Sequence, residues 1–324
     1  MAGLSRDQLE QFDRDGFLKV EGLLDPIKDL DPIIEEYRGV LDRLARRLFE
    51  QGRLASPYIE LPFGERLIKL YEETGENLSQ HFDFHLPQGN IKHDTPIWVG
   101  PAVFRALTNP QLLDAVESFI GPEIYSNPVQ HVRIKPPERF VAKDEEGRAK
   151  LGATNWHQDN GVVLPEADES DILTVWFSLT DAEEKHGCLE VVPGSHRDGL
   201  LTHCPAGPGG LEIPEKLLDR GRAVALPTVR GDVLFLHRRT AHASLRNVSD
   251  EIRWSFDLRY NPTGQETGRG VFPGFVARSR QNPESELRDP EDWAERWYAA
   301  RRHLADIDYH QPFNRWDPDA PACA

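Results

Sequence analysis

The chain has 324 residues, of which 39% are hydrophobic, and its seven Trp and fifteen Phe can supply a large core. This composition is typical of a globular protein and excludes a disordered chain. The formal net charge of −16 argues against a nucleic-acid or anionic-membrane partner, because both present negative charge of their own.

The N-terminus and the cysteines favour a cytoplasmic protein. The opening residues MAGLSRDQLEQFDRDGF contain no apolar core of a signal peptide. No stretch approaches the roughly 20 apolar residues of a membrane span. Cys188, Cys204 and Cys323 are odd in number and form no CxxC pair, which favours reduced thiols in an intracellular setting.

Helical patterns occupy the first third of the chain. Residues 5–50 have helical character, with Ser5 and Gln8 placed as a capping box. Residues 108–120 form a further helical segment, with Pro110 in its first turn.

Short apolar runs separated by Gly, Pro and Asp follow residue 121 and predict a β barrel or sandwich. The expected strands are residues 124–134, 154–158, 172–179, 188–192, 223–226, 232–237, 240–246 and 252–260. Residues 290–304 return to helical spacing. We therefore expect one domain spanning residues 1–324, with a mostly helical part, a β core and a helical extension at residues 1–120, 121–262 and 263–324.

The stretch NWHQDNG, residues 155–161, carries the first chemical signal. On a strand His157 and Asp159 face the same side, so they can supply two ligands to one divalent metal ion. His242 is the candidate third ligand, and two His with one carboxylate leave coordination positions open, as in non-haem Fe(II) oxygenases. Taken alone, the pair fits a hydrogen-bonded strand end equally well.

The residues after His242 add a second signal. Ser244 faces the same side of the strand, and Asn247 with Ser249 predicts a turn. Arg253 lies eleven residues after His242 and opens a strand-like run. A guanidinium at that place can bind a carboxylate through two parallel hydrogen bonds, aided by the Ser244 hydroxyl.

In this order the motifs resemble the phytanoyl-CoA dioxygenase family of Fe(II)/2-oxoglutarate oxygenases. Four more segments resemble the family: DGFLKVEGLL (15–24), IKPP (134–137), WFSLTDAEEKHGCLEVVPGSH (176–196) and GDVLFLH (231–237). The resemblance covers roughly residues 5–262. It implies a double-stranded β-helix, or jelly-roll, core that makes the protein mainly β with helical additions at both ends.

The resemblance also implies roles for individual residues. His157, Asp159 and His242 would bind Fe(II), and Arg253 with Ser244 would hold the distal carboxylate of 2-oxoglutarate. Two further residues, His131 and Trp176, fall at or near positions that contact the cosubstrate in the family. O2 and 2-oxoglutarate would give succinate and CO2 while a C–H bond of the substrate is oxidised. The carboxylate of Asp159 favours hydroxylation over halogenation, because halogenating members carry a small residue there.

The substrate is expected to be a small molecule, with no nucleic-acid or membrane partner, and the protein a monomer or homodimer. Candidate substrate contacts are Arg133, Asn155, Trp156, Asn160, Val162 and Arg259. Residues 160–171 are a candidate lid, with a plain exposed loop as the alternative, and Arg259 is expected at the pocket mouth. Two other functions stay open: a cupin-like metalloenzyme that does not use 2-oxoglutarate, and a non-catalytic jelly-roll binding module.

Overall fold

The computed structural model describes residues 3–141, 143, 145, 152–206, 210–307, 309 and 315–323. Within these ranges seven strands form an antiparallel sheet in the order β1-β10-β5-β12-β2-β13, with β3 also paired to β12. Its strands are β1 (Phe17–Val20), β2 (Glu123–Ser126), β3 (His131–Lys135), β5 (Leu173–Ser178), β10 (Val233–His237), β12 (Arg253–Pro262) and β13 (Phe275–Ser279).

A second, four-stranded antiparallel sheet has the order β4-β11-β6-β9 within the described residues. Its strands are β4 (Thr154–His157), β6 (Leu189–Val191), β9 (Val224–Leu226) and β11 (His242–Ser244), and β7 (Cys204–Pro205) pairs separately with β8 (Leu211–Glu212). The two antiparallel sheets confirm the expected jelly-roll core.

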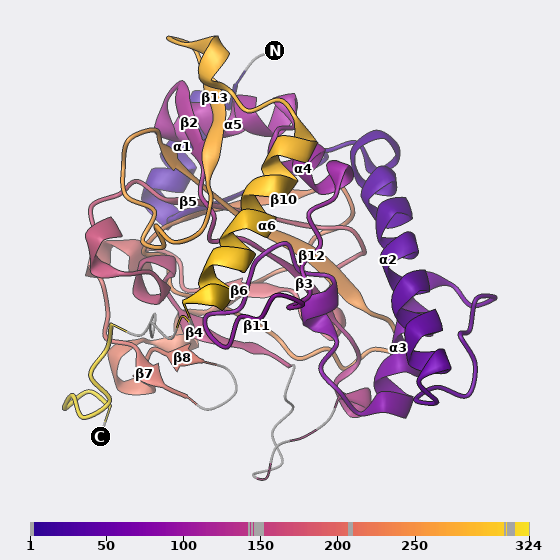
Figure 1. The fold of residues 1–324 in the computed structure, drawn as a ribbon. Coiled ribbons are helices and arrows are strands. Elements are labelled where there is room, and N and C mark those ends of the chain that lie inside the picture. The colour runs from indigo at the N-terminus through magenta and orange to yellow at the C-terminus, as the bar shows by residue number, and fades with distance from the viewer. Residues whose placement is uncertain are drawn as a thin grey trace.

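Helices cover the outer face of the larger sheet (Figure 1). They are α1 (Arg6–Asp15), α2 (Asp31–Glu50), α3 (Phe63–Thr74), α4 (Pro101–Leu107), α5 (Pro110–Ile120), α6 (Pro290–Asp306) and a π-helical turn at Pro26–Leu30. Short 3-10 turns span Ser79–His81, Glu138–Phe140, Asp159–Val162, Pro165–Ala167, Glu184–His186, Ser195–Asp198, Glu215–Leu217, Arg220–Arg222 and Pro283–Ser285.

Strand alternation explains how the larger sheet is buried on both faces. Val175 and Phe177 of β5 pack into the core formed with the helices. Trp176, which lies between them, packs with Leu189 and Val191 of the second sheet instead. Because successive side chains leave a strand on opposite faces, one apolar run can serve both layers. The same alternation turns a set of polar side chains toward the space between the sheets.

The prediction that residues 5–50 are helical throughout is wrong at β1. The Ser5 capping box is present and starts α1, but Gly16 ends that helix in the left-handed region at φ 79°. Phe17 and the residues after it then pair with β10 at the edge of the larger sheet. A strand of four residues leaves too little periodicity to interrupt a helical pattern in the sequence.

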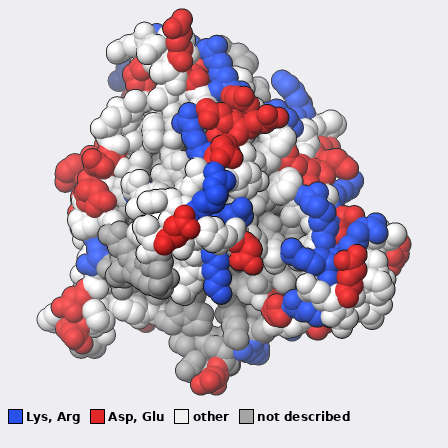
Figure 2. Space-filling model, in the orientation of Figure 1, with Lys and Arg blue, Asp and Glu red and all other residues white. Residues whose placement is uncertain are grey.

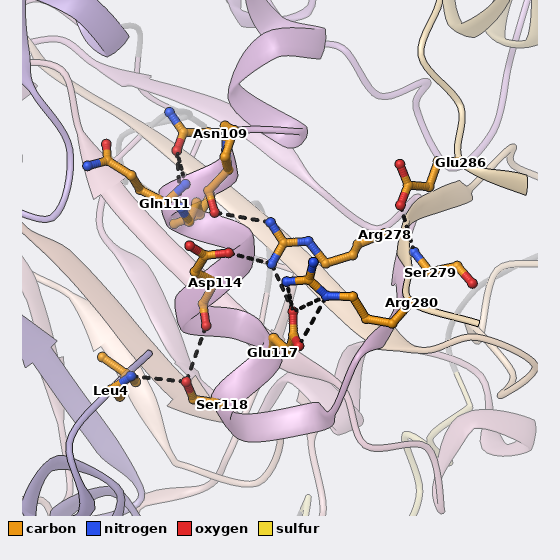
Figure 3. Close-up of polar contacts among 12 residues, drawn as sticks. Leu4, Asn109, Gln111, Asp114, Glu117, Ser118, Arg278, Ser279, Arg280 and Glu286 are labelled. Atoms are coloured by element: carbon orange, nitrogen blue, oxygen red, sulfur yellow. Dashed lines mark hydrogen bonds and ion pairs between the residues drawn. The ribbon is translucent and has the colours of Figure 1, made fainter. Parts of the chain in front are cut away.

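A second edge strand, β13, follows residue 262 and is held by α5 (Figure 3). Arg278 donates to Asp114 Oδ1 at 2.7 Å and to Glu117 Oε2 at 2.9 Å, and Arg280 also binds Glu117. The ion pairs join the edge of the larger sheet to a helix of the N-terminal part. The larger sheet therefore includes strands on both sides of residues 121–262.

The C-terminal segment contradicts the expectation that Cys204 is an ordinary thiol. Cys204 and Cys323 form a disulfide across 119 residues. Trp316 stacks on His203 with ring centroids 5.2 Å apart and donates to the Gly161 carbonyl at 2.7 Å. The segment therefore covers the turn that follows β4. Cys188 is buried and free, as expected.

The surface carries both signs of charge. Figure 2 shows acidic and basic side chains interspersed on the face displayed. In the described part of the chain, no helix combines the length and the apolar character needed to cross a membrane.

We expect Cys323→Ser to loosen residues 315–323 without unfolding either sheet, because the disulfide holds the far end of that segment. Hydrogen–deuterium exchange should become faster in peptides covering residues 315–323 and 159–162. Cys188→Ser, which removes a buried free thiol, should leave exchange in both peptides unchanged. Equal exchange in wild type and Cys323→Ser would contradict the prediction.

Candidate active site

Two histidines face each other where β4 ends and β11 begins. The antiparallel register pairs His157 directly with His242, and their ring centroids lie 4.2 Å apart. Asp159 follows in a 3-10 turn, and one ligand atom from each of the three residues lies within 4.8 Å of the others. The structure therefore brings the three predicted metal ligands together.

Backbone carbonyls fix which nitrogen each imidazole offers. The Nδ1–H of His157 donates to the Asn155 carbonyl at 2.8 Å, and that of His242 donates to the Thr240 carbonyl at 3.0 Å. Each Nε2 keeps its lone pair and is directed to the shared position. Burial lowers the pKa of His157 to about 3, which keeps its ring in the neutral form that binds a metal ion.

Gln158 separates the two ligands and points the other way. Its backbone is extended, with φ −112° and ψ 142°. Its side chain donates to the Gly199 and Arg239 carbonyls at 2.8 and 2.7 Å and accepts from the Leu201 N–H at 2.8 Å. These bonds anchor the residue between the ligands, so Asp159 leaves the chain on the same side as His157.

Two residues hold the carboxylate of Asp159. The Thr174 hydroxyl donates to Oδ2, and Arg259 donates to Oδ1. Burial alone would raise the pKa of Asp159, but the neighbouring charges, that of Arg259 foremost, hold it below its usual value. The sequence did not indicate Thr174 as a site residue. Arg259, expected at the pocket mouth, instead lies against a metal ligand because it faces Thr174 across β12 and β5.

The histidines open into a cavity of about 340 Å³ between the two sheets. Its lining is drawn from both sheets and from loops at the mouth. The described lining residues are Gln88, Val129, His131, Arg133, Thr154, His157, Val162, Thr174, Trp176, Leu189, Pro205, Gly210, Leu211, His242, Ala243, Ser244, Arg253, Asp257, Arg259 and Arg269.

At another part of the cavity Ser244 has a hydroxyl hydrogen to give. Its Oγ accepts from Lys135 Nζ at 2.8 Å and from the Thr154 N–H at 2.9 Å. Because both lone pairs are used, the hydroxyl hydrogen is left for another acceptor. Lys135, which the sequence analysis did not single out, lies opposite Arg253 in the β3–β12 register.

Arg253 is a buried cation without a carboxylate partner among the described residues. It is 2% exposed and donates to Ser255 Oγ at 2.6 Å, and its Nε has no hydrogen-bond partner there. Its guanidinium lies 5.6 Å from the Trp176 ring centroid. Burial, with the charge of Arg133 nearby, lowers the pKa of Arg253 to about 10. A bound anion would offset both the burial of the Arg253 charge and its repulsion by Arg133.

The other sequence candidates divide into two groups. His131, Arg133 and Val162 line the cavity with Trp176. His131 also binds Asp83, with Nδ1 and Oδ2 2.8 Å apart.

The described residues that line the cavity do not include Asn155, Trp156 or Asn160. Trp156 leaves β4 on the face opposite His157 and packs with Val192 and Ala241. Asn160 is buried and donates to the Ala167 carbonyl at 3.2 Å. These placements argue against direct substrate contact by the three residues.

Residues 160–171, the expected lid, pack against the rest of the protein. Val163 and Ala167 belong to a small buried cluster with Val129. Arg315 binds the Asp168 carboxylate through both terminal nitrogens. Among its residues, Val162 is the one that reaches the cavity lining.

The donor set fits iron with 2-oxoglutarate. Two imidazole nitrogens and one carboxylate on one side of a position are the ligands that non-haem Fe(II) oxygenases use. The Arg253 guanidinium, which no carboxylate of the described residues binds, lies in the same cavity and suits the free carboxylate of a dicarboxylic acid.

Comparison with known proteins gives the same assignment. The family described as phytanoyl-CoA dioxygenase (PhyH) matches residues 12–255. A Bos taurus phytanoyl-CoA dioxygenase domain-containing protein 1 is 28% identical over 79% of this chain and 89% of its own length. The peroxisomal phytanoyl-CoA dioxygenase of Bos taurus is 27% identical over 79% of this chain and 68% of its own length.

Solved structures support the fold. The non-heme monooxygenase ThoJ in its apo form superimposes with a TM-score of 0.59 at 21% identity, covering 92% of this chain and 97% of its own. The ThoJ–Ni complex gives 0.51 at 21% identity, covering 92% and 98%. The chain therefore belongs to the phytanoyl-CoA dioxygenase family of non-haem iron, 2-oxoglutarate-dependent oxygenases.

Proposed function

We propose that this enzyme hydroxylates an unactivated C–H bond of a small-molecule metabolite, with 2-oxoglutarate and O2 converted to succinate and CO2. One observation carries the proposal: His157, His242 and the buried Arg253 line a single cavity. A metal position and a carboxylate-binding cation in one enclosed space suit a chelating dicarboxylate.

In this proposal each polar group has one task. His157, Asp159 and His242 hold the iron, whose complex with 2-oxoglutarate supplies the oxidising power. Arg253 and Ser244 bind the distal carboxylate. Beside that carboxylate Lys135 fixes the Ser244 oxygen, while Trp176 and His131 form walls of the cavity. The surrounding apolar side chains exclude water from the reacting centre.

Asp159 supports oxygenation over halogenation. Its carboxylate occupies a ligand position that a halide would otherwise need, and Thr174 and Arg259 hold it there. A cupin-like enzyme that does not bind 2-oxoglutarate does not require a buried arginine in the same cavity as a serine whose hydroxyl hydrogen can be donated. Family membership likewise argues against a non-catalytic binding module.

The proposal is tested by screening small metabolites with the Fe(II)-loaded protein in the presence of 2-oxoglutarate, while measuring succinate formation and O2 consumption. A substrate should produce one hydroxylated product for each succinate released. Failure of any metabolite to stimulate succinate release, together with no binding of 2-oxoglutarate by the metal-loaded protein, would contradict the proposal.

Removal of one metal ligand should abolish iron binding. His157→Ala and Asp159→Ala each leave two ligands. We expect both the Fe(II) that remains bound after desalting and the rate of succinate release to fall to background. Metal analysis checks the result. His196→Ala, which changes a histidine outside the cavity lining, serves as the control and should retain iron.

Loss of the Arg253 charge should weaken cosubstrate binding and spare the metal. A charge-assisted hydrogen bond contributes roughly 1.5–3 kcal/mol, so Arg253→Gln should raise the Kd for 2-oxoglutarate by about 10- to 100-fold. Ser244→Ala should have a smaller effect. Calorimetry with Mn(II)-loaded protein measures both, and an unchanged Kd for Arg253→Gln would count against the assigned carboxylate site.

The Thr174 hydroxyl should raise the affinity for Fe(II) by holding the Asp159 carboxylate in place. Partners of metal ligands typically contribute about 10- to 100-fold in metal affinity or activity, so Thr174→Val should lower Fe(II) affinity by about tenfold or more. Thr263→Val changes an exposed threonine next to β12 and should have no effect. Equal affinities for the two variants would show that the hydroxyl does not hold the ligand.

A further inference from the structure

Residues 157–161, here called the ligand turn, carry two of the three proposed metal ligands and are also contacted from outside the cavity. The Gln158 N–H donates to His203 Nε2 at 2.9 Å. The Gly161 carbonyl accepts from Trp316 Nε1 at 2.7 Å. Neither His203 nor Trp316 is among the described residues that line the cavity. Both contacts are therefore made to the main chain, away from the space where metal and substrate would bind.

The His203 imidazole is buried and held in one orientation. Its exposed fraction is 0%. Its Nδ1–H donates to the Leu201 carbonyl at 2.9 Å, so Nε2 keeps the lone pair that accepts from the Gln158 N–H. A Cβ on Gly161 would overlap the imidazole ring. Glycine at that position therefore allows the ring to lie directly against the ligand turn.

The Trp316 side chain makes two contacts in this arrangement. Its ring stacks on His203, with centroids 5.2 Å apart and ring planes 25° apart. Its indole N–H, which can only donate, binds the Gly161 carbonyl. One side chain therefore packs the imidazole against the ligand turn and also binds the turn itself. A phenyl ring at the same place could make the first contact but not the second.

The segment that contributes Trp316 is covalently joined to the residue next to His203. Cys323 forms its disulfide with Cys204, which directly follows His203 in the sequence. The disulfide limits how far residues 315–323 can move from the imidazole on which the tryptophan stacks. The C-terminal segment, His203 and the ligand turn are thus held together by one covalent bond, one ring contact and two hydrogen bonds.

We propose that His203 and Trp316 are positioning residues for the metal site, and that the disulfide-anchored segment 315–323 keeps them against the ligand turn. The inference rests on the proposed function and adds residues that do not touch the metal. The family match ends at residue 255, so membership assigns no role to this segment. A shift of the ligand turn would move the Asp159 carboxylate relative to the two histidines, and metal affinity depends on that geometry.

The test uses full-length protein and Co(II), whose visible d–d absorption reports both binding and the geometry of the ligands. Trp316→Phe keeps a ring on His203 but removes the N–H. We expect it to raise the Kd for Co(II) about fivefold and to alter the d–d spectrum. Trp316→Ala removes both contacts and should raise the Kd further. Cys323→Ser should have a smaller effect of the same kind, because it removes the anchor and neither contact.

Trp98→Phe is the matched control. The Trp98 indole N–H donates to Glu36 Oε1 at 2.9 Å, and neither residue is among the described residues that line the cavity. The substitution therefore removes a hydrogen bond of the same kind elsewhere, and both the Kd and the d–d spectrum should equal those of wild type. Far-UV circular dichroism of each metal-free variant checks that it is folded at the temperature of the titration.

Two results would overturn the positioning role while the proposed metal site stands. The first is a wild-type Kd and spectrum in both Trp316 variants, from a protein that loses Co(II) binding in His157→Ala. The second is an equal loss of affinity in Trp316→Phe and Trp98→Phe, which would reflect general stability. Absence of Co(II) binding by wild type, or binding that His157→Ala leaves unchanged, would instead refute the proposed metal site and this inference with it.

Discussion

The site depends on the pairing of β11 with β4. That register sets His242 opposite His157, and the next pocket-facing residue of β11, Ser244, then approaches Thr154 and Lys135. A slip of β11 by one residue would turn His242 and Ser244 out of the cavity, because side chains alternate along a strand. β6 pairs with the other edge of β11 and thereby fixes the strand that carries a metal ligand and the serine.

The larger sheet supplies the opposing wall by the same alternation. Arg253, Asp257 and Arg259 leave β12 on its cavity face, while Phe256 and Leu258 between them pack against the helices. The apolar residues fix the strand, and the polar residues gain defined positions from that packing. The neighbouring strands β3 and β5 add rows of cavity residues through their registers with β12. The chemistry is thus built on rigid strands, which position reactive groups closely.

The sequence was sufficient to predict the site residues that belong to a recognisable motif. Strand alternation and motif order suffice for His157, His242, Ser244 and Arg253, which line one cavity, and for Asp159, which lies beside the two histidines. The same alternation could have excluded Trp156, which faces away from His157.

Other features depend on pairings that no local pattern contains. The contacts of Thr174 and Arg259 with Asp159 require the register between β5 and β12. The disulfide joins residues 119 apart, and edge strands such as β1 are too short for a clear period.

The central claim is that the His–Asp–His group and the Arg253 carboxylate site act together on one molecule of 2-oxoglutarate. Anaerobic titration of 2-oxoglutarate into the Fe(II)-loaded full-length protein, followed by visible absorption, tests it most directly. Chelation at the iron should produce a charge-transfer band that saturates at one 2-oxoglutarate per iron. Protein that retains iron but develops no such band at saturating 2-oxoglutarate would contradict the account.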